Sequence, residues 1–148
     1  FCFLYFWTIF NRTNFLDLHF NNYITKLLMA TFVITKRPSG VYKYELTSRK
    51  GKTIFTSNAF ELRFECEEEI EYVKQRVEQI LFMNFRSGGG KFYFKMIVNG
   101  KEVAVSRKYT TQLLMEKGIN EIKRYMQSAE ILDFSLGNDI FGDVIFED

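Results

Sequence analysis

The stretch that decides the fold is GGGKFYFKMIVNGKEVAVS, residues 88–106, because GVYKYELTSRKGKTIFTS at residues 40–57 is nearly the same. The glycines and alternating apolar residues of the two stretches align at an offset of 50, which becomes 49 after one deletion. Aligned residues keep their character over more than thirty positions. Self-similarity at one fixed spacing is the signature of a repeated structural unit. We therefore predict two tandem repeats, at about 30–81 and 82–136.

Each repeat contains a pattern typical of a β-hairpin. In residues 92–98 every second position faces one side of a strand, and residues 42–46 alternate in the same way. Asn99-Gly100 then predicts a two-residue type I′ turn, because both central residues of that turn need a positive φ. Residues 49–51 (Arg-Lys-Gly) predict a turn one residue longer, with the glycine in the left-handed conformation, which accounts for the deletion.

After each hairpin the apolar residues recur at steps of three and four, which indicates one buried stripe of an amphipathic helix. The two stripes are Cys66, Ile70, Val73, Val77 and Ile80, and Met115, Ile119, Ile122 and Met126. Either Thr110 or Thr111 is a candidate N-cap for the second helix. The first helix, expected to begin near Leu62, has no comparable cap.

An extended stretch follows each helix, at Phe82–Arg86 and at Ile131–Phe134. Phe82–Arg86 also aligns with Phe32–Lys36, the first strand of the first repeat, so the same segment closes one repeat and opens the next. Shared strands join the repeats into one sheet. We predict an α+β fold in which two tandem β3-α-β repeats form one mainly antiparallel sheet with two helices packed on one face.

The two ends of the chain differ from this pattern. Residues 1–28 are rich in Phe, Leu, Ile, Tyr and Asn, as expected of AT-rich DNA translated without selection, so we expect Met29 to be the start and residues 1–28 to be upstream translation or a disordered leader. A membrane anchor is disfavoured because the apolar run Phe1–Phe10 is half the roughly 20 residues that a spanning helix needs. Residues 29–136 form the single domain. The tail, 137–148, is acidic, and Val144–Phe146 could add a short strand to the sheet.

Charge and cysteine content exclude several classes of protein. The net charge of +2 gives no strong electrostatic attraction to nucleic acid or to an anionic membrane. Cys2 and Cys66 are too few for a disulfide framework, so a reducing, cytoplasmic location is expected.

Two sequence features are typical of ligand sites but have simpler structural interpretations. Gly88–Lys91 is not a phosphate-binding loop, because such a loop needs G-x-x-x-x-G-K-[ST] and leads into a helix, whereas Phe92 begins a strand. It is a hairpin turn that matches residues 38–40. The carboxylates of Glu65–Glu71 spread around a helix axis and indicate a solvated helix face rather than a cation site.

Cys66 is the one plausible thiol nucleophile in the domain. The sole histidine, His19, lies in the doubtful leader, and the position that matches Cys66 in the second repeat is Met115, so Cys66 is interpreted as a small core residue. We therefore predict no catalytic, metal-binding or cofactor-binding residue and no cofactor.

The open face of the sheet, opposite the helices, supplies the candidate contact residues. They are Lys43, Glu45, Tyr93 and Lys95. Basic and aromatic residues on a sheet are typical of some RNA-binding modules. Against that function, the RNP1 pattern is missing, carboxylates are interleaved, and the domain is nearly neutral.

Residues 90–123, GKFYFKMIVNGKEVAVSRKYTTQLLMEKGINEIK, resemble the second repeat of YegP-like proteins, small bacterial proteins of unknown function. The shared pattern is Gly90–Phe94, then Asn99-Gly100, the step from Ser106 to Tyr109, and Glu116 to Ile119. The resemblance covers about Ala30 to Phe134. It is weaker in the first repeat, where Glu69 replaces the helix glycine and Phe60 replaces the tyrosine. It implies a tandem of β3-α-β units with exchanged terminal strands, and it brings no activity or catalytic residues.

The expected function is that of a small, non-enzymatic binding or interaction module with a protein partner. Weak nucleic-acid binding through the open sheet face is the first alternative, and an enzyme with an unrecognised site is the second. Because both repeats lie in one chain, we expect a monomer.

Overall fold

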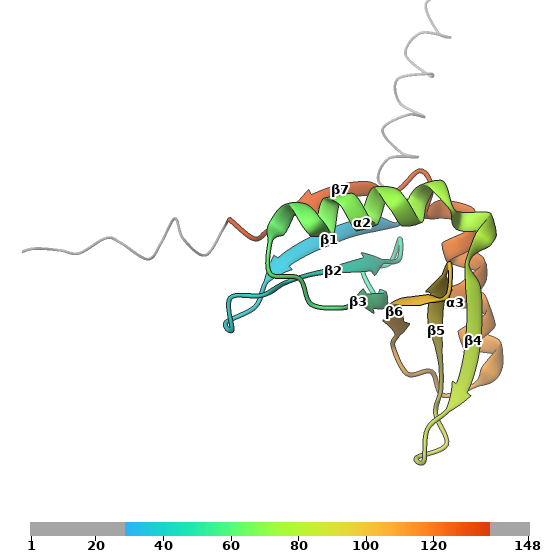
Figure 1. Cartoon of the computed structure of the whole chain (residues 1–148). Helices are drawn as coiled ribbons and strands as arrows, with labels where there is room; N and C mark the ends of the chain where they lie inside the picture. Colours follow the sequence, from blue (N-terminus) through green and yellow to red (C-terminus); the bar gives the residue numbers. More distant parts are fainter. Residues whose placement is uncertain (1–28, 137–148) are drawn as a thin grey trace, which may run out of the picture.

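The computed structural model describes residues 29–136, which form a seven-stranded mixed sheet with two helices (Figure 1). In chain order the elements are β1 (Thr31–Lys36), β2 (Tyr42–Thr47), β3 (Thr53–Ser57), α2 (Arg63–Gln75), a 3₁₀ turn (Val77–Gln79), β4 (Leu81–Arg86), β5 (Phe92–Val98), β6 (Lys101–Ser106), α3 (Gln112–Tyr125) and β7 (Glu130–Asp133). The expectations for the leader and for the tail, the Val144–Phe146 strand included, lie outside the described residues.

The strand order across the sheet is β4-β5-β6-β3-β2-β1-β7. All neighbouring strands are antiparallel except β1 and β7, which run parallel. The fold is therefore α+β with one mixed sheet. We call residues 30–80 the N-terminal half and residues 81–136 the C-terminal half, because β4 begins at Leu81, one residue before the expected boundary.

The two halves meet where β3 pairs with β6. Figure 1 shows α2 lying along β1 and β2, whereas α3 lies behind β4 and β5, and the two parts of the sheet are turned steeply against one another. A strong right-handed twist is the ordinary consequence of strand sterics, and the irregular registers in β2–β3 and β5–β6 increase it.

The core lies between the sheet and the helices and is built from aromatic side chains of alternate strand positions. Phe32, Tyr44 and Phe55 contact one another edge to face, with ring centroids 5.9 to 6.4 Å apart. Phe82 and Phe94 form the corresponding contact in the C-terminal half, at 5.6 Å. Burial of each such ring stabilises the fold by about 1.5–3 kcal/mol.

The turns have the conformations that the sequence predicts. Asn99 and Gly100 have φ of 49° and 77°, as the type I′ turn requires, and Gly51 has φ of 71°. In the glycine-rich segment, Gly90 has φ of 77° and its N–H donates to the carbonyl of Ser87 at 2.9 Å. This segment is a turn between β4 and β5, so the interpretation of it as a hairpin turn is confirmed.

The first helix is shorter than the apolar stripe predicts. α2 ends at Gln75, and Val77 lies in the 3₁₀ turn, while Ile80 is extended with φ of −71° and ψ of 123°. Both side chains are buried. The prediction that they continue the helix was wrong, because a tight turn can bring the same side chains to the core.

The sequence contains two candidate N-caps for the second helix, Thr110 and Thr111. Thr111 is the N-cap, and its Oγ1 accepts a hydrogen bond from the Leu114 N–H at 3.3 Å. α2 starts after Leu62, which offers no polar side chain, and the Leu62 N–H donates instead to Glu65 Oε2 at 3.0 Å.

The last strand crosses to the other half of the molecule. β7 follows α3 in the chain but pairs with β1, and Phe134 just beyond it donates its N–H to the Ile34 carbonyl at 2.9 Å. Asp133 also pairs with Arg63 at the start of α2. Within residues 29–136, no helix is long and apolar enough to span a bilayer.

Candidate functional site

The structure separates the four predicted open-face residues into two pairs. Lys43 and Glu45 lie on β2, and Tyr93 and Lys95 lie on β5. β3 and β6 stand between these strands, so the pairs are about 14 Å apart at the usual strand spacing.

Two of these four side chains have their charges paired on the sheet. Glu45 accepts from Arg37 at 2.9 Å and from Thr53 Oγ1 at 3.1 Å. Lys95 donates to Glu102 at 2.9 Å, and this hydrogen bond raises the pKa of Lys95. Paired charges attract a ligand less strongly, and the role of this face stays a prediction.

A groove that the sequence analysis did not single out lies where the β2–β3 turn reaches α3. Its volume is about 550 Å³, and we call it the basic groove. It is lined by Ser48, Arg49, Lys50, Lys52, Ile54, Arg107, Tyr109, Leu114, Lys117, Gly118 and Glu121. Five basic side chains and a single carboxylate therefore surround a floor that contains Ile54, Tyr109 and Leu114.

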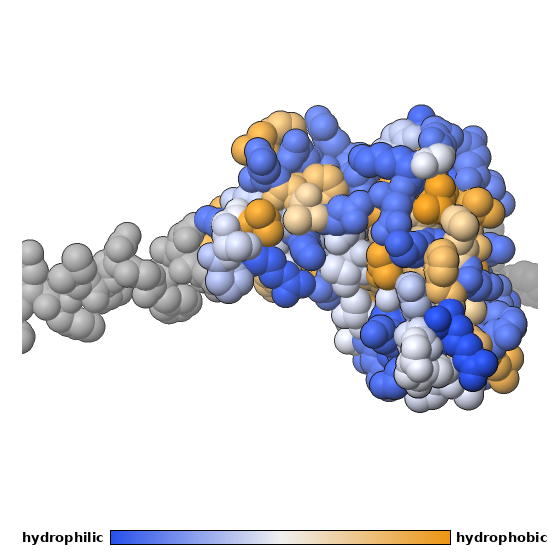
Figure 2. Space-filling view, turned by 60° about the horizontal axis from the view of Figure 1, so that its bottom comes forward, coloured by the Kyte–Doolittle hydropathy of each residue, from blue (hydrophilic) through white to orange (hydrophobic). Residues whose placement is uncertain are grey.

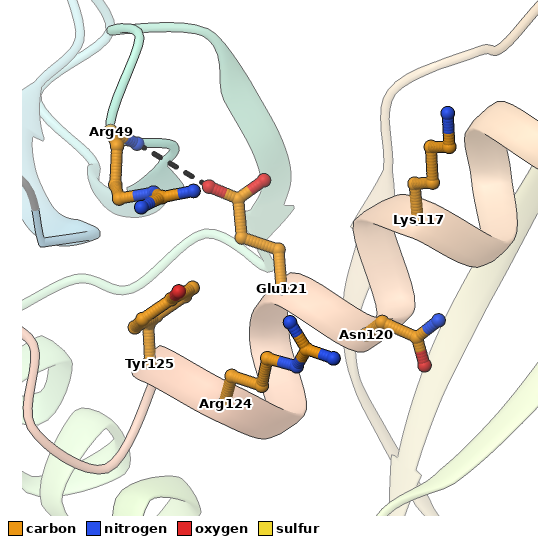
Figure 3. A pocket seen from close by; sticks show the side chains of 6 residues that line it. All are labelled: Arg49, Lys117, Asn120, Glu121, Arg124 and Tyr125. Carbon is orange, nitrogen blue, oxygen red and sulfur yellow. Dashed lines mark hydrogen bonds between the residues drawn. The ribbon is translucent and has the colours of Figure 1, made fainter.

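The basic groove continues into a shallower pocket on α3, shown in Figure 3. Glu121 and Tyr125 point from the helix toward Arg49 of the turn (Figure 3). The Arg49 N–H donates to Glu121 Oε1 at 3.4 Å, and its guanidinium lies over the Tyr125 ring, 5.0 Å from the centroid. These contacts hold the turn against the helix and keep the groove formed.

A second groove, of about 560 Å³, lies where the β5–β6 turn reaches α2, and we call it the acidic groove. It is lined by Phe60, Glu65, Glu68, Glu69, Tyr72, Val98, Asn99, Lys101 and Val103. Asn99 Nδ2 donates to Tyr72 Oη at 2.7 Å and connects the turn to the helix, as Arg49 and Glu121 do in the basic groove.

The two grooves occupy matching positions in the chain. Every residue that lines the acidic groove has a counterpart, 49 or 50 positions away, that lines the basic groove. The charges are reversed, because Glu68 corresponds to Lys117, and Glu65 and Glu69 correspond to Leu114 and Gly118. The same backbone arrangement therefore presents two different electrostatic surfaces.

The floor of the basic groove contains a buried polar atom without a partner. Tyr109 is 3% exposed, and its hydroxyl has no hydrogen-bond partner within the described residues. The hydroxyl lies against Gly118, where a Cβ would collide with it. Burial raises the pKa of Tyr109, although Arg107, whose guanidinium lies 4.7 Å from the ring centroid, lowers it. The hydroxyl therefore stays protonated.

Tyr109 stacks on Phe94 of β5, and the matching stack beside the acidic groove consists of Phe60 and Tyr44 of β2. In this second stack the hydroxyl belongs to the residue on the strand, Tyr44. Phe60 stacks on Tyr44 at 6.1 Å, and the Tyr44 hydroxyl donates to Glu69 Oε1 at 3.1 Å. Burial raises the pKa of Tyr44 well above its ordinary value, and the Glu69 charge raises it further. The replacements noted from the sequence, Phe60 for tyrosine and Glu69 for glycine, are therefore linked: a Cβ fits at position 69 because Phe60 lacks a hydroxyl.

Cys66 and the carboxylates around it form no reactive centre. Cys66 is fully buried, and burial, followed by the neighbouring carboxylates, raises the pKa of its thiol to about 12. A thiol held in this protonated state is a poor nucleophile. Within residues 29–136, no group of His, Cys, Asp and Glu side chains is arranged to hold a metal ion.

Sequence reasoning missed the basic groove because it compared the repeats by their shared apolar character. The sequence could have indicated the groove through the positions at which aligned residues of the two halves differ in charge. Arg49 in the turn, which aligns with Asn99, and Lys117 in the helix, which aligns with Glu68, carry that signal. Only the contact between the turn and α3, which are far apart in sequence, brings them together.

Comparison with known proteins agrees with the fold. Residues 88–133 match a family described as a domain of unknown function, DUF1508. A UPF0339 protein in the ptx operon 5′ region of Stutzerimonas stutzeri is 24% identical over 108 residues, which cover 72% of this chain and 97% of the relative. A UPF0339 protein of Pseudomonas aeruginosa is 26% identical over 110 residues, covering 73% of this chain and all of the relative.

Two solved structures share the arrangement of strands and helices. YegP of E. coli, a protein of unknown function, matches with a TM-score of 0.63 and 22% identity over 73% of this chain and 95% of its own. The resemblance to the YegP-like family is confirmed. A UPF0339 protein of Shewanella oneidensis matches with a TM-score of 0.66 and 19% identity over 73% of this chain and 93% of its own. The YegP-like family is one of unknown function, so it assigns no activity or site to these grooves.

Proposed function

We propose that this chain is a non-enzymatic binding module built from two copies of one β3-α-β unit, and that its basic groove binds an acidic segment of a partner protein. The observation that carries the proposal is the charge reversal between matching grooves. Five basic side chains surround the groove of the C-terminal helix, whereas three glutamates line the corresponding groove of α2.

The duplication is supported by the order of the elements. Each half contains three antiparallel strands followed by a helix, and the paired ring stacks, Tyr44 with Phe60 and Phe94 with Tyr109, occupy matching positions. After a duplication, the two copies can keep the same core packing while the surface residues of one copy change. The difference between the two grooves is then the place to seek function.

The ligand chemistry follows from the lining. Exposed Lys and Arg side chains bind carboxylates, and the apolar floor of Ile54 and Leu114 accepts an aliphatic or aromatic neighbour. A groove open to solvent suits a peptide segment better than an enclosed small molecule.

The remaining parts of the proposal concern assembly and location. Both halves of the sheet lie in one chain and are joined by β3 and β6, which favours a monomer. The buried free thiol of Cys66 is typical of a reducing, cytoplasmic environment.

The groove can be tested by fluorescence anisotropy with a fluorescein-labelled hexaglutamate peptide and the full chain. The double variant K52E/K117E changes two exposed lining residues and should weaken binding at least tenfold, because it replaces attraction with repulsion. The single variants Lys52→Glu and Lys101→Glu change the net charge equally and form the matched control pair, since Lys101 holds the position of Lys52 in the acidic groove. Equal losses in both variants would show that net charge, not the groove, causes binding.

The same titration with a labelled single-stranded oligonucleotide addresses the alternative of nucleic-acid binding. Phe85 and Tyr93 stack on the open face at 5.4 Å, beside Lys95, and bases could extend that stack. Tighter binding of the oligonucleotide than of the peptide, unaffected by K52E/K117E, would favour the open face over the groove.

A further inference from the structure

The strand β4 forms one edge of the sheet and pairs only with β5 among the described residues. Its counterpart in the N-terminal half is β1, which aligns with it at an offset of 50. β1 has β2 on one side and β7, in parallel, on the other. The position beside β4 that corresponds to β7 holds no strand from residues 29–136.

The backbone groups that face this position can be identified from the β5 side. Phe92 exchanges both of its hydrogen bonds with Tyr109, at 2.8 and 2.7 Å, so its groups point away from β4. The Arg86–Phe92 pair is therefore a non-hydrogen-bonded pair of the ladder. By alternation, Phe82, Asn84 and Arg86 direct their N–H and C=O groups outward.

In the N-terminal half, the corresponding outward-facing backbone groups of β1 form hydrogen bonds with another strand. Phe32 and Ile34, which correspond to Phe82 and Asn84, lie in the pairing of β1 with β7, and the carbonyl of Ile34 accepts from the Phe134 N–H at 2.9 Å. The free edge of β4 therefore has the hydrogen-bonding pattern of an edge that the same fold fills with a parallel strand.

Apart from Arg86 at its end, β4 lacks the features that keep sheet edges from pairing. Natural edges are protected by charges, proline or bulges. Residues 81–85 contain none of these, and Leu81 and Met83 are 58% and 44% exposed on the open face. Figure 2 shows hydrophobic residues among hydrophilic ones over the half that carries β4 and β5. The opposite edge, β7, carries Glu130 and Asp133.

We propose that β4 is a strand-addition site, which binds an extended, acidic and apolar segment of another protein in parallel, as β7 binds β1. The charge around the edge selects the acidic segment. Arg86 lies at the end of β4, and Lys123 of α3 lies over the Phe82 ring, 5.6 Å from its centroid. In β7, the acidic residue Asp133 pairs with Arg63 of α2, so an added strand of this fold already uses a carboxylate against a basic side chain, although the position of Arg63 beside β4 is held by Gln112.

A second copy of this chain fits the edge less well. A two-fold antiparallel pairing of β4 with β4 brings Arg86 of one molecule close to Phe82 of the other, and so close to the Lys123 that covers it. Because of the two-fold symmetry, Arg86 of each molecule would approach Lys123 of the other, and the repulsion between these like charges disfavours the dimer. A partner segment with carboxylates removes this repulsion.

The experiment uses the full chain labelled with ¹⁵N and a synthetic peptide with the sequence AEILDFSL, that of residues 129–136. This peptide is the segment that the fold already adds to β1. The expected result is a shift of the amide signals of Phe82, Asn84 and Arg86, which a scrambled peptide does not cause. A spin label at the peptide's N-terminus should broaden the signals near Leu81 most, because the pairing is parallel.

Four variants sharpen the test. Asn84→Pro removes an outward N–H without removing a bond to β5 and should weaken binding at least tenfold, whereas Asn84→Ala should not. Arg86→Glu should also weaken binding, and it keeps the backbone unchanged if the proline variant fails to fold. K52E/K117E should leave this binding unchanged, which separates the strand-addition site from the proposed function of the basic groove.

Several outcomes would overturn the proposal. They are the absence of any shift at millimolar peptide, shifts confined to the basic groove or to β1 and β7, broadening strongest near Arg86, and wild-type affinity in Arg86→Glu. Sedimentation that shows a dimer dissociated by the peptide would assign the edge to a second copy.

Discussion

At the scale of single residues, the two halves differ by where one hydroxyl lies. In the N-terminal half the hydroxyl belongs to Tyr44, and it donates a hydrogen bond to Glu69 Oε1 at 3.1 Å. In the C-terminal half Tyr109 carries it, without a partner in the described residues, and Gly118 leaves the space. Gly118 is therefore needed for packing in the middle of a helix, where glycine otherwise costs about 0.5–1 kcal/mol relative to alanine.

Gly118→Ala should destabilise the protein by about 1–3 kcal/mol, because its Cβ collides with the Tyr109 hydroxyl and overpacks the site. Tyr109→Phe alone should be nearly neutral, since it removes a buried hydroxyl without a partner. The double variant should recover most of the loss. Urea unfolding of the four proteins measures the coupling. Additive losses would contradict the proposed contact.

At the scale of elements, helix α3 is fixed at its start by one hydroxyl and at its middle by Tyr109. Thr111 Oγ1 satisfies one of the N–H groups that the first turn leaves free. At the start of α2, the N-cap residue Leu62 has no polar side chain, and its N–H donates to the Glu65 side chain. The element that lines the basic groove therefore has a stronger local start signal than its counterpart.

Thr111→Ala should lower the free energy of unfolding by about 1 kcal/mol, because the Leu114 N–H loses its partner. Thr110→Ala is the matched control, an exposed neighbour whose change should stay within about 0.5 kcal/mol. Chemical denaturation of both variants decides the point. A larger loss at Thr110 would mean that the helix begins one residue earlier than the structure shows.

At the scale of the whole molecule, three connections join the halves. β3 pairs with β6, β7 crosses to β1, and each hairpin turn contacts the helix of the other half. Asp133 of β7 adds an ion pair with Arg63. Burial by itself raises the pKa of Asp133, but hydrogen bonds from Ser135 and Arg63 outweigh burial and bring this pKa below its ordinary value. These connections favour one cooperative unit.

We expect a single unfolding transition in which both halves take part. Ile34→Val in β1 and Ile122→Val in α3 each remove a methylene from a fully buried side chain and should each cost about 0.5–1.5 kcal/mol. Calorimetry should show the same single peak moved to lower temperature in both variants, with calorimetric and van't Hoff enthalpies equal. Two peaks, of which each variant moves one, would show that the halves unfold separately.

The elements of each half were determined by local sequence. Residues 92–98 alternate in character because successive side chains of a strand point to opposite faces of the sheet. Asn99 and Gly100 can both adopt positive φ values. Cys66, Ile70 and Val73 repeat at the helical period. These properties depend on neighbours in the chain, so they could be predicted. The end of α2 could not, because burial of Val77 and Ile80 is satisfied by a turn as well as by a helix.

What only the tertiary structure decided is the partner of each element. The parallel addition of β7 to β1, the pairing of β3 with β6 that leaves β4 at one edge of the described sheet, and the gathering of Arg49, Lys52 and Lys117 in one groove all join segments far apart in the chain. Alternation and helical period state which side of an element is apolar, but not which other element covers it. The packing of the whole sheet makes that choice, and here it places unlike charges on two grooves whose lining residues occupy matching positions.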